Sequence, residues 1–97
     1  MNSFTLELHD ATQMQRIADV VSFVGEDASG SFGLKAGHAR LMTVLTFGLA
    51  RFRLRHGDWQ YVAMPGAVLT FTADLLWIGT RRFLLDSDYT RVSRLLQ

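Results

Sequence analysis

A strict alternation of apolar and charged residues in the middle of the chain constrains its fold more than any other feature. Along Leu49–Arg55, apolar residues at positions 50, 52 and 54 alternate with arginines at 51, 53 and 55. Alternation with a period of two places the apolar side chains on one face of a β-strand and the arginines on the other. His56–Asp58 then predicts a hairpin turn, and Trp59–Met64 predicts the returning strand. The sequence therefore predicts a β-hairpin with one buried face.

Short apolar segments separated by turn residues predict an all-β fold for most of the chain. Pro65 ends the returning strand, because proline has no amide hydrogen for a ladder, and Gly25–Gly30 predicts the clearest loop. Many short strands at regular spacing indicate a β-sandwich or a β-barrel. The β-branched residues of Ile17–Val24 predict a strand that is buried over much of its length. The other expected strands are Phe4–Leu8, Ser31–Leu34, Leu41–Leu45, Ala67–Thr72, Leu75–Ile78 and Arg81–Leu85.

The residues after Leu85 predict a change from strand to helix. Asp86 and Asp88 offer side-chain oxygens that can cap the first turn of a helix. Apolar residues then recur at helical spacing at positions 92, 95 and 96. The expected organisation is a β-sandwich domain over residues 1–85, followed by the start of a C-terminal helical region over residues 86–97.

The amino-acid composition limits the class of protein. A chain of 97 residues, 48% of them apolar, can build one packed domain. Its formal net charge of +1 is too small to predict a polyanionic partner through long-range attraction. The absence of cysteine excludes disulfides and thiolate metal ligands. No apolar run reaches the ~20 residues that a membrane-spanning helix needs, so we expect a soluble, cytoplasmic protein.

No combination of residues in the sequence predicts an enzyme. His9, His38 and His56 are far apart and lack the spacing of paired metal ligands, which favours surface histidines over a metal site. Ser29 and Ser31 have no base in a pattern that would activate them. We therefore expect no catalytic residues, no cofactor and no metal.

The stretch Gly25–Gly33 has the glycine content of a phosphate-binding loop. It lacks the Gly-Lys-Ser/Thr sequence that follows such loops, and no helix is expected after it. Its acidic residues, Glu26 and Asp27, would also repel phosphate. The sequence therefore predicts no phosphate site in this loop.

The arginine row of Leu49–Arg55 permits two interpretations. Together with Trp59 and Tyr61 it resembles a surface for nucleic acid, on which bases stack against aromatic rings. We favour the second interpretation, in which both aromatic residues point into the core and the arginines form a solvated face or a protein contact. A free-standing β-sandwich or barrel that binds nucleic acid or sugar is kept as the alternative function.

The stretch Gly30–Thr43 is the most informative about function. It reads Gly-Ser-Phe-Gly-Leu-Lys-Ala-Gly-His-Ala-Arg-Leu-Met-Thr, and glycine at this spacing indicates backbone at positive φ or a close approach of another surface. It resembles the Gly-x-x-Gly-x-x-x-Gly-His-x-x-x-x-Thr stretch of the ε subunit of F-type ATP synthases. The resemblance continues through Phe47–Arg51, the His56–Gly57 hairpin and Pro65–Leu69, so it covers nearly the whole chain.

The resemblance implies a flattened β-sandwich of about ten strands followed by C-terminal helices. It also implies a non-catalytic rotor subunit of the central stalk, which clamps the γ subunit to the c-ring and so couples ion flow to ATP synthesis or hydrolysis. Such a subunit is peripheral, lies at the cytoplasmic face of the bacterial inner membrane and touches the membrane only through the complex, without nucleic acid. The implied c-ring contacts are Ser29, Gly30, Ser31, Phe32 and Gly33, and the implied γ contacts are Asp10, His38, Ala39 and Thr43.

The chain departs from the family pattern within the same stretch. Ala36 and Arg40 stand where the family commonly has proline, and Ser31 stands where an acidic residue is frequent. Loss of that acid weakens the case for an ion pair with the basic groups of the c-ring loops. Glu26 and Asp27 are the nearby acids that can substitute for it.

The C-terminal region departs most from the family. Leu85–Tyr89 does not match the Asp-x-x-Arg-Ala type of nucleotide motif, which implies that the chain does not bind ATP. Only the beginning of the first helix is present, without an inhibitory helical hairpin. We expect a trimmed chain more than an unusual family member. Such divergence also fits the alternate, sodium-type group of F-type ATP synthases.

Overall fold

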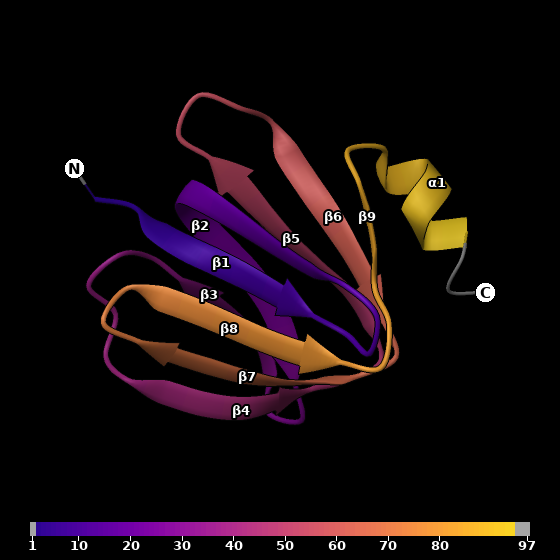
Figure 1. Cartoon of the computed structure of the whole chain (residues 1–97), viewed down its shortest axis with the longest axis horizontal. Helices are drawn as coiled ribbons and strands as arrows, with labels where there is room; N and C mark the ends of the chain where they lie inside the picture. The colour runs from indigo at the N-terminus through magenta and orange to yellow at the C-terminus, as the bar shows by residue number, and fades with distance from the viewer. Residues whose placement is uncertain (1, 95–97) are drawn as a thin grey trace.

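Nine β-strands and one short helix make up residues 2–94, the part of the chain that the computed structural model describes (Figure 1). The predicted all-β fold that ends in the start of a helix is confirmed, with nine strands in this range instead of about ten. No helix in the same range is long and apolar enough to cross a membrane. The elements are β1 (Phe4–His9), β2 (Met14–Asp27), β3 (Gly30–Leu34), β4 (Leu41–Leu45), β5 (Gly48–Leu54), β6 (Trp59–Met64), β7 (Ala67–Thr72), β8 (Leu75–Thr80), β9 (Leu84–Asp86) and α1 (Tyr89–Arg94).

The strands form two layers that pack face to face. One layer has the order β1-β8-β7-β4, in which β1 and β8 are parallel and the other pairs are antiparallel. The second layer has the order β3-β2-β5-β6-β9 and is antiparallel throughout. The layers are joined where β1 pairs with β2 and where Asp27 pairs with Leu45. These two junctions close the sandwich around a single core.

The core is built from apolar side chains that alternate along the strands of both layers. In β1, for example, Phe4, Leu6 and Leu8 are buried and the residues between them are half-buried. The rings of Phe4 and Phe71 meet edge to face with their centroids 5.3 Å apart, a geometry that contributes about 0.5–1.5 kcal/mol beyond the area buried. Within the described residues, every buried side-chain nitrogen or oxygen has a hydrogen-bond partner. A core packed in this way resists shear between its layers.

The strand β2 is longer than predicted and passes along the junction of the two layers. A β-bulge interrupts its pairing with β1 between Ile17 and Val20. Within the predicted strand Ile17–Val24, only Val20 and Phe23 are buried, so the prediction of a strand buried over much of its length is wrong. β2 is less buried than predicted because it runs along the junction of the two layers. A strand in that position buries only the side chains that turn toward the core.

Asp19 and Arg55 fix the bend in β2. Asp19 has a φ of 65°, which a non-glycine residue adopts only when its surroundings enforce it. Its carbonyl accepts a hydrogen bond of 3.1 Å from the Arg55 amide, and its carboxylate accepts one of 3.1 Å from Arg55 Nε. Arg55, the last arginine of the predicted row, therefore stabilises the folded structure through these two hydrogen bonds.

The predicted loop Gly25–Gly30 is wrong at both ends. β2 continues through Asp27 and β3 begins at Gly30, so that only Ala28 and Ser29 form the turn. Acidic residues normally favour loops, but here the Asp27 carboxylate bonds to the turn itself and permits a tight hairpin.

The prediction that Trp59 and Tyr61 point into the core is also wrong. Trp59 pairs with Arg53 and Tyr61 pairs with Arg51, and paired residues project from the same face of a sheet. Both aromatic rings therefore share the outer face with the arginines. The register of the β5–β6 hairpin determines which β6 side chains face the core. Val62 pairs with the buried Ala50 and therefore points inward.

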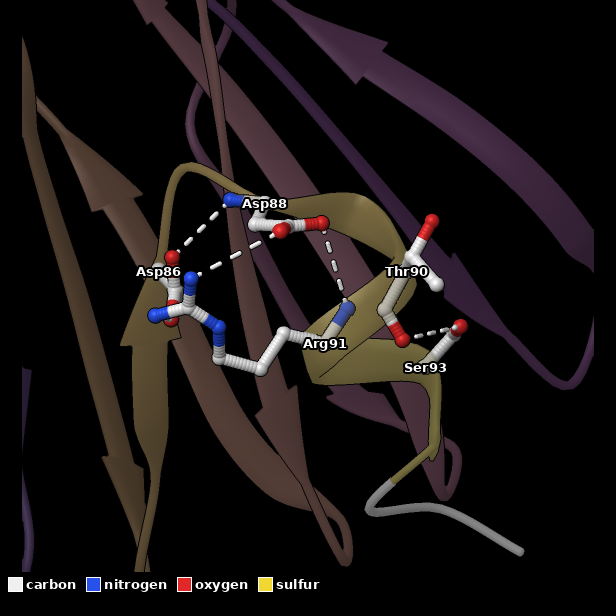
Figure 2. Close-up of polar contacts among 5 residues, drawn as sticks. All are labelled: Asp86, Asp88, Thr90, Arg91 and Ser93. Atoms are coloured by element: carbon white, nitrogen blue, oxygen red, sulfur yellow. Dashed lines mark hydrogen bonds and ion pairs between the residues drawn. The ribbon is translucent and has the colours of Figure 1, made fainter.

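The helix α1 is capped as predicted and lies beside β9 and β6 (Figure 1). Asp88 accepts a hydrogen bond of 3.2 Å from the Arg91 amide, as an N-cap residue does, and Asp86 accepts one of 2.9 Å from the Asp88 amide (Figure 2). The Arg91 guanidinium also lies 3.1 Å from Asp86. Val92 is buried, as its spacing predicts. The other two predicted helical positions, Leu95 and Leu96, lie outside the described residues.

Candidate docking surfaces

The β2–β3 turn, which carries the first predicted c-ring contacts, is held by one carboxylate. Asp27 Oδ1 accepts hydrogen bonds from the Ser29 amide at 2.9 Å and the Ser29 hydroxyl at 2.6 Å. Asp27 Oδ2 accepts a third bond, at 2.7 Å, from the hydroxyl of Thr43 on β4. These bonds lower the pKa of Asp27 below its usual value, the Ser29 hydroxyl contributing most and the Thr43 hydroxyl next. The same hydrogen bonds therefore favour the ionised form of Asp27 and fix the shape of the turn.

The predicted c-ring contacts lie together on one hairpin. Ser29 is at its tip, and Gly30, Ser31, Phe32 and Gly33 follow along β3. Ser29, Ser31 and Gly33 are exposed, whereas Phe32 is half-buried against the core, with its ring centroid 6.5 Å from that of Phe23. The hairpin thus presents small, polar side chains and backbone outward.

Two of the three glycines in the Gly30–Thr43 stretch need the freedom that glycine provides. Gly30 has a φ of 118° and Gly37 a φ of 82°, both in the region that side chains disfavour. Gly33 has no positive φ, and a Cβ added there would meet the Phe23 carbonyl oxygen at an ordinary 3.7 Å. The backbone explanation of the motif therefore holds at positions 30 and 37 and not at 33.

The predicted γ contacts are not brought together by the fold. His38 and Ala39 lie in the loop that precedes β4, whereas Asp10 follows β1. The register across β7 and β8 aligns Val44, near the end of β4, with His9, at the end of β1. The end of β1, which Asp10 follows, therefore lies at the opposite end of this layer from the start of β4, which His38 and Ala39 precede; Figure 1 shows the two strand ends.

Two of the predicted γ contacts, Asp10 and Thr43, form hydrogen bonds that stabilise the structure around them. The Asp10 carboxylate accepts hydrogen bonds from the Thr12 amide at 2.8 Å and the Gln13 amide at 2.9 Å. These bonds, that from the Thr12 amide foremost, lower the pKa of Asp10. Thr43 is half-buried, and its hydroxyl is bonded to Asp27.

The fold exposes an apolar surface beside these residues that the sequence-based prediction missed. Met42 and Val44 flank Thr43 on β4 and are 75% and 64% exposed, and Val68, which pairs with Val44, is 45% exposed. Trp77 lies in the same row as Met42, across β7. We call Met42, Val44, Val68 and Trp77 the apolar face.

The apolar face continues toward the end of the sheet that holds Asp10. A shallow groove of about 850 Å³ is lined by Val44, Val68 and Trp77 and by His9 and Asp10, among others. The signal for this face was in the sequence, because Leu41–Leu45 is apolar at four of its five positions. An apolar run normally means a strand buried on both faces, whereas here only the Leu41 and Leu45 side is covered.

The described residues contain no group of three histidine, aspartate or glutamate side chains placed to hold a metal ion. Large exposed apolar patches mark contacts with proteins or membranes, or ligand-binding grooves.

Comparison with known proteins decides the family. A sequence model described as "ATP synthase, Delta/Epsilon chain, beta-sandwich domain" matches residues 3–85. The chain belongs to this family. A curated relative, ATP synthase epsilon chain 2 of Cereibacter sphaeroides, is 39% identical over 74 residues, which are 75% of this chain and 51% of the relative. The chain thus spans about half the length of that relative, and the resemblance read from Gly30–Thr43 is confirmed.

Solved ATP synthases contain chains with the same fold. One is in the Euglena gracilis mitochondrial ATP synthase (OSCP/F1/c-ring, rotational state 1), with a TM-score of 0.80, 15% identity and coverage of 96% of this chain and 61% of that chain. Another is in the central stalk/c-ring of the Tetrahymena thermophila mitochondrial ATP synthase, with a TM-score of 0.72, 10% identity and coverage of 84% and 66%. At these identities the comparison concerns the fold alone.

Proposed function

We propose that the chain is a non-catalytic rotor subunit of an F-type ATP synthase, and that its apolar face docks against the γ subunit. The observation that carries the proposal is the exposure of Met42, Val44 and Val68 side by side on one sheet. Burying such side chains against a partner contributes about 25 cal/mol per Å² of apolar surface. Family membership supplies the kind of assembly, since the curated relative is an ATP synthase epsilon chain.

The c-ring is the second proposed partner, and the β2–β3 hairpin is its contact. Ser29, Ser31 and Gly33 are exposed there, which permits close approach of another chain. Glu26 pairs directly with Ser31 and is exposed, whereas Asp27 is occupied by Ser29 and Thr43. Of the two substitutes for the family's acidic residue, Glu26 is therefore the one available to a basic group of the ring.

A rotor subunit that clamps γ to the ring must carry torque without deforming. The Asp27 carboxylate joins the hairpin, through Ser29, to β4, through Thr43. The two proposed contact regions are thus bonded to each other within one closed sandwich. The proposal locates the subunit at the cytoplasmic face of the bacterial inner membrane, with residues 1–85 as the docking domain and residues 86–97 as the start of a helical region.

The apolar face is tested by mixing the chain with its cognate γ subunit and analysing the mixture by size-exclusion chromatography. We expect the wild type to co-elute with γ, and Met42→Glu and Val44→Glu to elute separately, because each buries a charge in the interface. Leu84→Glu is the matched control, since Leu84 is 50% exposed and lies on β9, in the other layer. Separate elution of the wild type would contradict the rotor proposal. Equal co-elution of all variants would contradict this choice of face.

A further inference from the structure

The outer face of β5 and β6 carries arginine side chains, in contrast to the apolar face. Arg51 and Arg53 alternate with Ala50 and Phe52, which are buried in the core. The arginines therefore project away from the core, on the layer that does not contain β4 and β7. A partner that covers the apolar face leaves this second face uncovered.

Two guanidinium groups and one indole ring form the centre of this second face. The guanidinium carbon of Arg51 lies 4.7 Å from the Trp59 ring centroid, and that of Arg53 lies 5.8 Å from it. Tyr61 pairs with Arg51 and meets the ring of Tyr89 on α1 edge to face, at 5.3 Å. We call Arg51, Arg53, Trp59 and Tyr61 the arginine–aromatic face. Stacking on an aromatic ring holds guanidinium planes in place and so reduces the entropy that binding costs.

Arg51 and Arg53 of this face differ from the other arginines near it in their pairing. Arg55 is paired with Asp19, and Arg91 is paired with two aspartates of its helix cap. Arg51 and Arg53 have no carboxylate within ion-pair distance in residues 2–94. Their hydrogen-bond donors therefore remain available to carboxylates, which guanidinium groups bind in a bidentate geometry.

A hollow beside Arg51 adds both apolar and polar groups to this face. It has a volume of about 290 Å³, and its lining includes the apolar Val24 and Leu49, the rings of Tyr61 and Tyr89, and the polar Glu26 and Ser31. Aromatic and arginine side chains around a small hollow are the composition that protein interfaces favour at their centres.

We propose that the arginine–aromatic face binds an acidic segment of a partner protein other than γ, with carboxylates on Arg51 and Arg53. Nucleic acid fits less well, because the positive region contains only two guanidinium groups. Glu26 lines the same hollow, and Asp86 pairs with Tyr61 at the other side of the face. These acids would repel a continuous phosphate backbone, whereas carboxylates separated by neutral residues avoid them.

The probe for this face is a short, fluorescently labelled peptide in which glutamates alternate with neutral residues, and its binding is followed by fluorescence anisotropy at low salt. We expect saturable binding that weakens as salt is added, because part of the attraction is between exposed charges. Arg51→Gln/Arg53→Gln should weaken binding by about tenfold, since both charge-assisted contacts are lost. Arg81→Gln/Arg82→Gln removes the same charge from an exposed loop and should bind as the wild type does. Binding of γ should be unchanged in Arg51→Gln/Arg53→Gln.

Three results would overturn the proposal. They are no binding of the glutamate-containing peptide to the wild type, equal weakening in the two double variants, and tighter binding of an oligodeoxythymidylate of the same length. Circular dichroism establishes that the variants are folded. If Arg51→Gln/Arg53→Gln does not fold, Arg51→Lys/Arg53→Lys replaces it, because lysine keeps the charge and loses the bidentate, stacked geometry. Wild-type affinity in that lysine variant would likewise contradict the proposal.

Discussion

The hydroxyl of Thr43 donates a hydrogen bond of 2.7 Å to the carboxylate of Asp27, although 16 residues separate them in the chain. The same carboxylate holds the Ser29 turn, so one side chain connects the proposed c-ring hairpin with β4. This bond reinforces a narrow junction, because β2 and β4 are otherwise joined there by the pairing of Asp27 with Leu45 and by a hydrogen bond of 3.0 Å from the Thr46 amide to the Glu26 carbonyl.

Replacing this carboxylate should loosen the hairpin and change the response to acid. The hydrogen bonds lower the pKa of Asp27 below its usual value of 3.8, so the stabilisation is complete above that pH and is lost as the pH falls through the folded-state pKa. We expect Asp27→Asn to lower Tm at neutral pH, to speed hydrogen exchange at Ser29 and Gly30, and to flatten the acid dependence of stability. Urea unfolding between about pH 6 and about pH 2 measures the last effect.

Glu26→Gln is the control for this experiment, because it removes an adjacent negative charge that holds no backbone group of the turn. Its acid dependence should resemble that of the wild type. An Asp27→Asn curve parallel to the wild-type curve would show that the carboxylate does not stabilise the folded state.

The two positive-φ glycines of the motif should tolerate alanine poorly. A side chain in this backbone region costs about 1–2 kcal/mol, and Gly30 and Gly37 both occupy it. We expect Gly30→Ala and Gly37→Ala each to lower the free energy of unfolding by roughly that amount in urea titrations. Gly33→Ala is the internal control and should be close to neutral, because an added Cβ has ordinary contacts there. Equal losses at all three positions would contradict the assignment of the strain.

Much of the fold follows from alternation and turn residues alone. β4, β6 and β7 have the bounds that the sequence predicts, because each is a regular strand between clear turn signals. β2 does not, because its bulge and its passage between layers depend on Asp19 and Arg55, which are 36 residues apart. Such contacts leave no periodic trace in the sequence.

The surfaces were harder to predict than the strands. Alternation shows which residues of β6 share a face but not which face is inside, and that choice depends on the pairing of Val62 with Ala50. The apolar run Leu41–Leu45 was predicted only as a strand, and a partner's footprint cannot be distinguished from core by composition. Family resemblance pointed to Thr43, whereas the exposed neighbours are Met42 and Val44.

Gly79 lies under the indole ring of Trp77, and this contact predicts the effect of replacing Gly79 by alanine. A Cβ at Gly79 would collide with that ring. The colliding atoms are at the outer edge of a half-buried side chain, so we expect the indole to swing outward in Gly79→Ala and the sheet to remain intact. Stability should fall by about 1 kcal/mol, and in a Trp59→Phe background the Trp77 emission should shift to longer wavelength.

The collision also predicts coupling between the two positions. In a double-mutant cycle, Gly79→Ala should cost less when Trp77 is already replaced by leucine, because the ring it meets is gone. Gly57→Ala is a control with room for a Cβ, which would lie 3.6 Å from Leu54. Additive effects of Gly79→Ala and Trp77→Leu, with unshifted emission, would contradict the contact.

The proposed ion pair with the c-ring gives a final prediction at Glu26. Glu26→Gln should weaken binding to the purified c-ring by a factor of about 1.4 to 5, since an exposed ion pair contributes about 0.2–1 kcal/mol. The loss should disappear at high salt, because screening removes the attraction in the wild type as well. Asp58→Asn, which makes the same charge change in the exposed β5–β6 turn, should leave binding unchanged.

Because Ser31 pairs with Glu26 across the hairpin, Ser31→Glu should restore binding in the Glu26→Gln background. Equal affinity of the wild type and Glu26→Gln at low salt, or failure of the Ser31→Glu rescue, would remove Glu26 from the interface while leaving the γ-docking proposal intact.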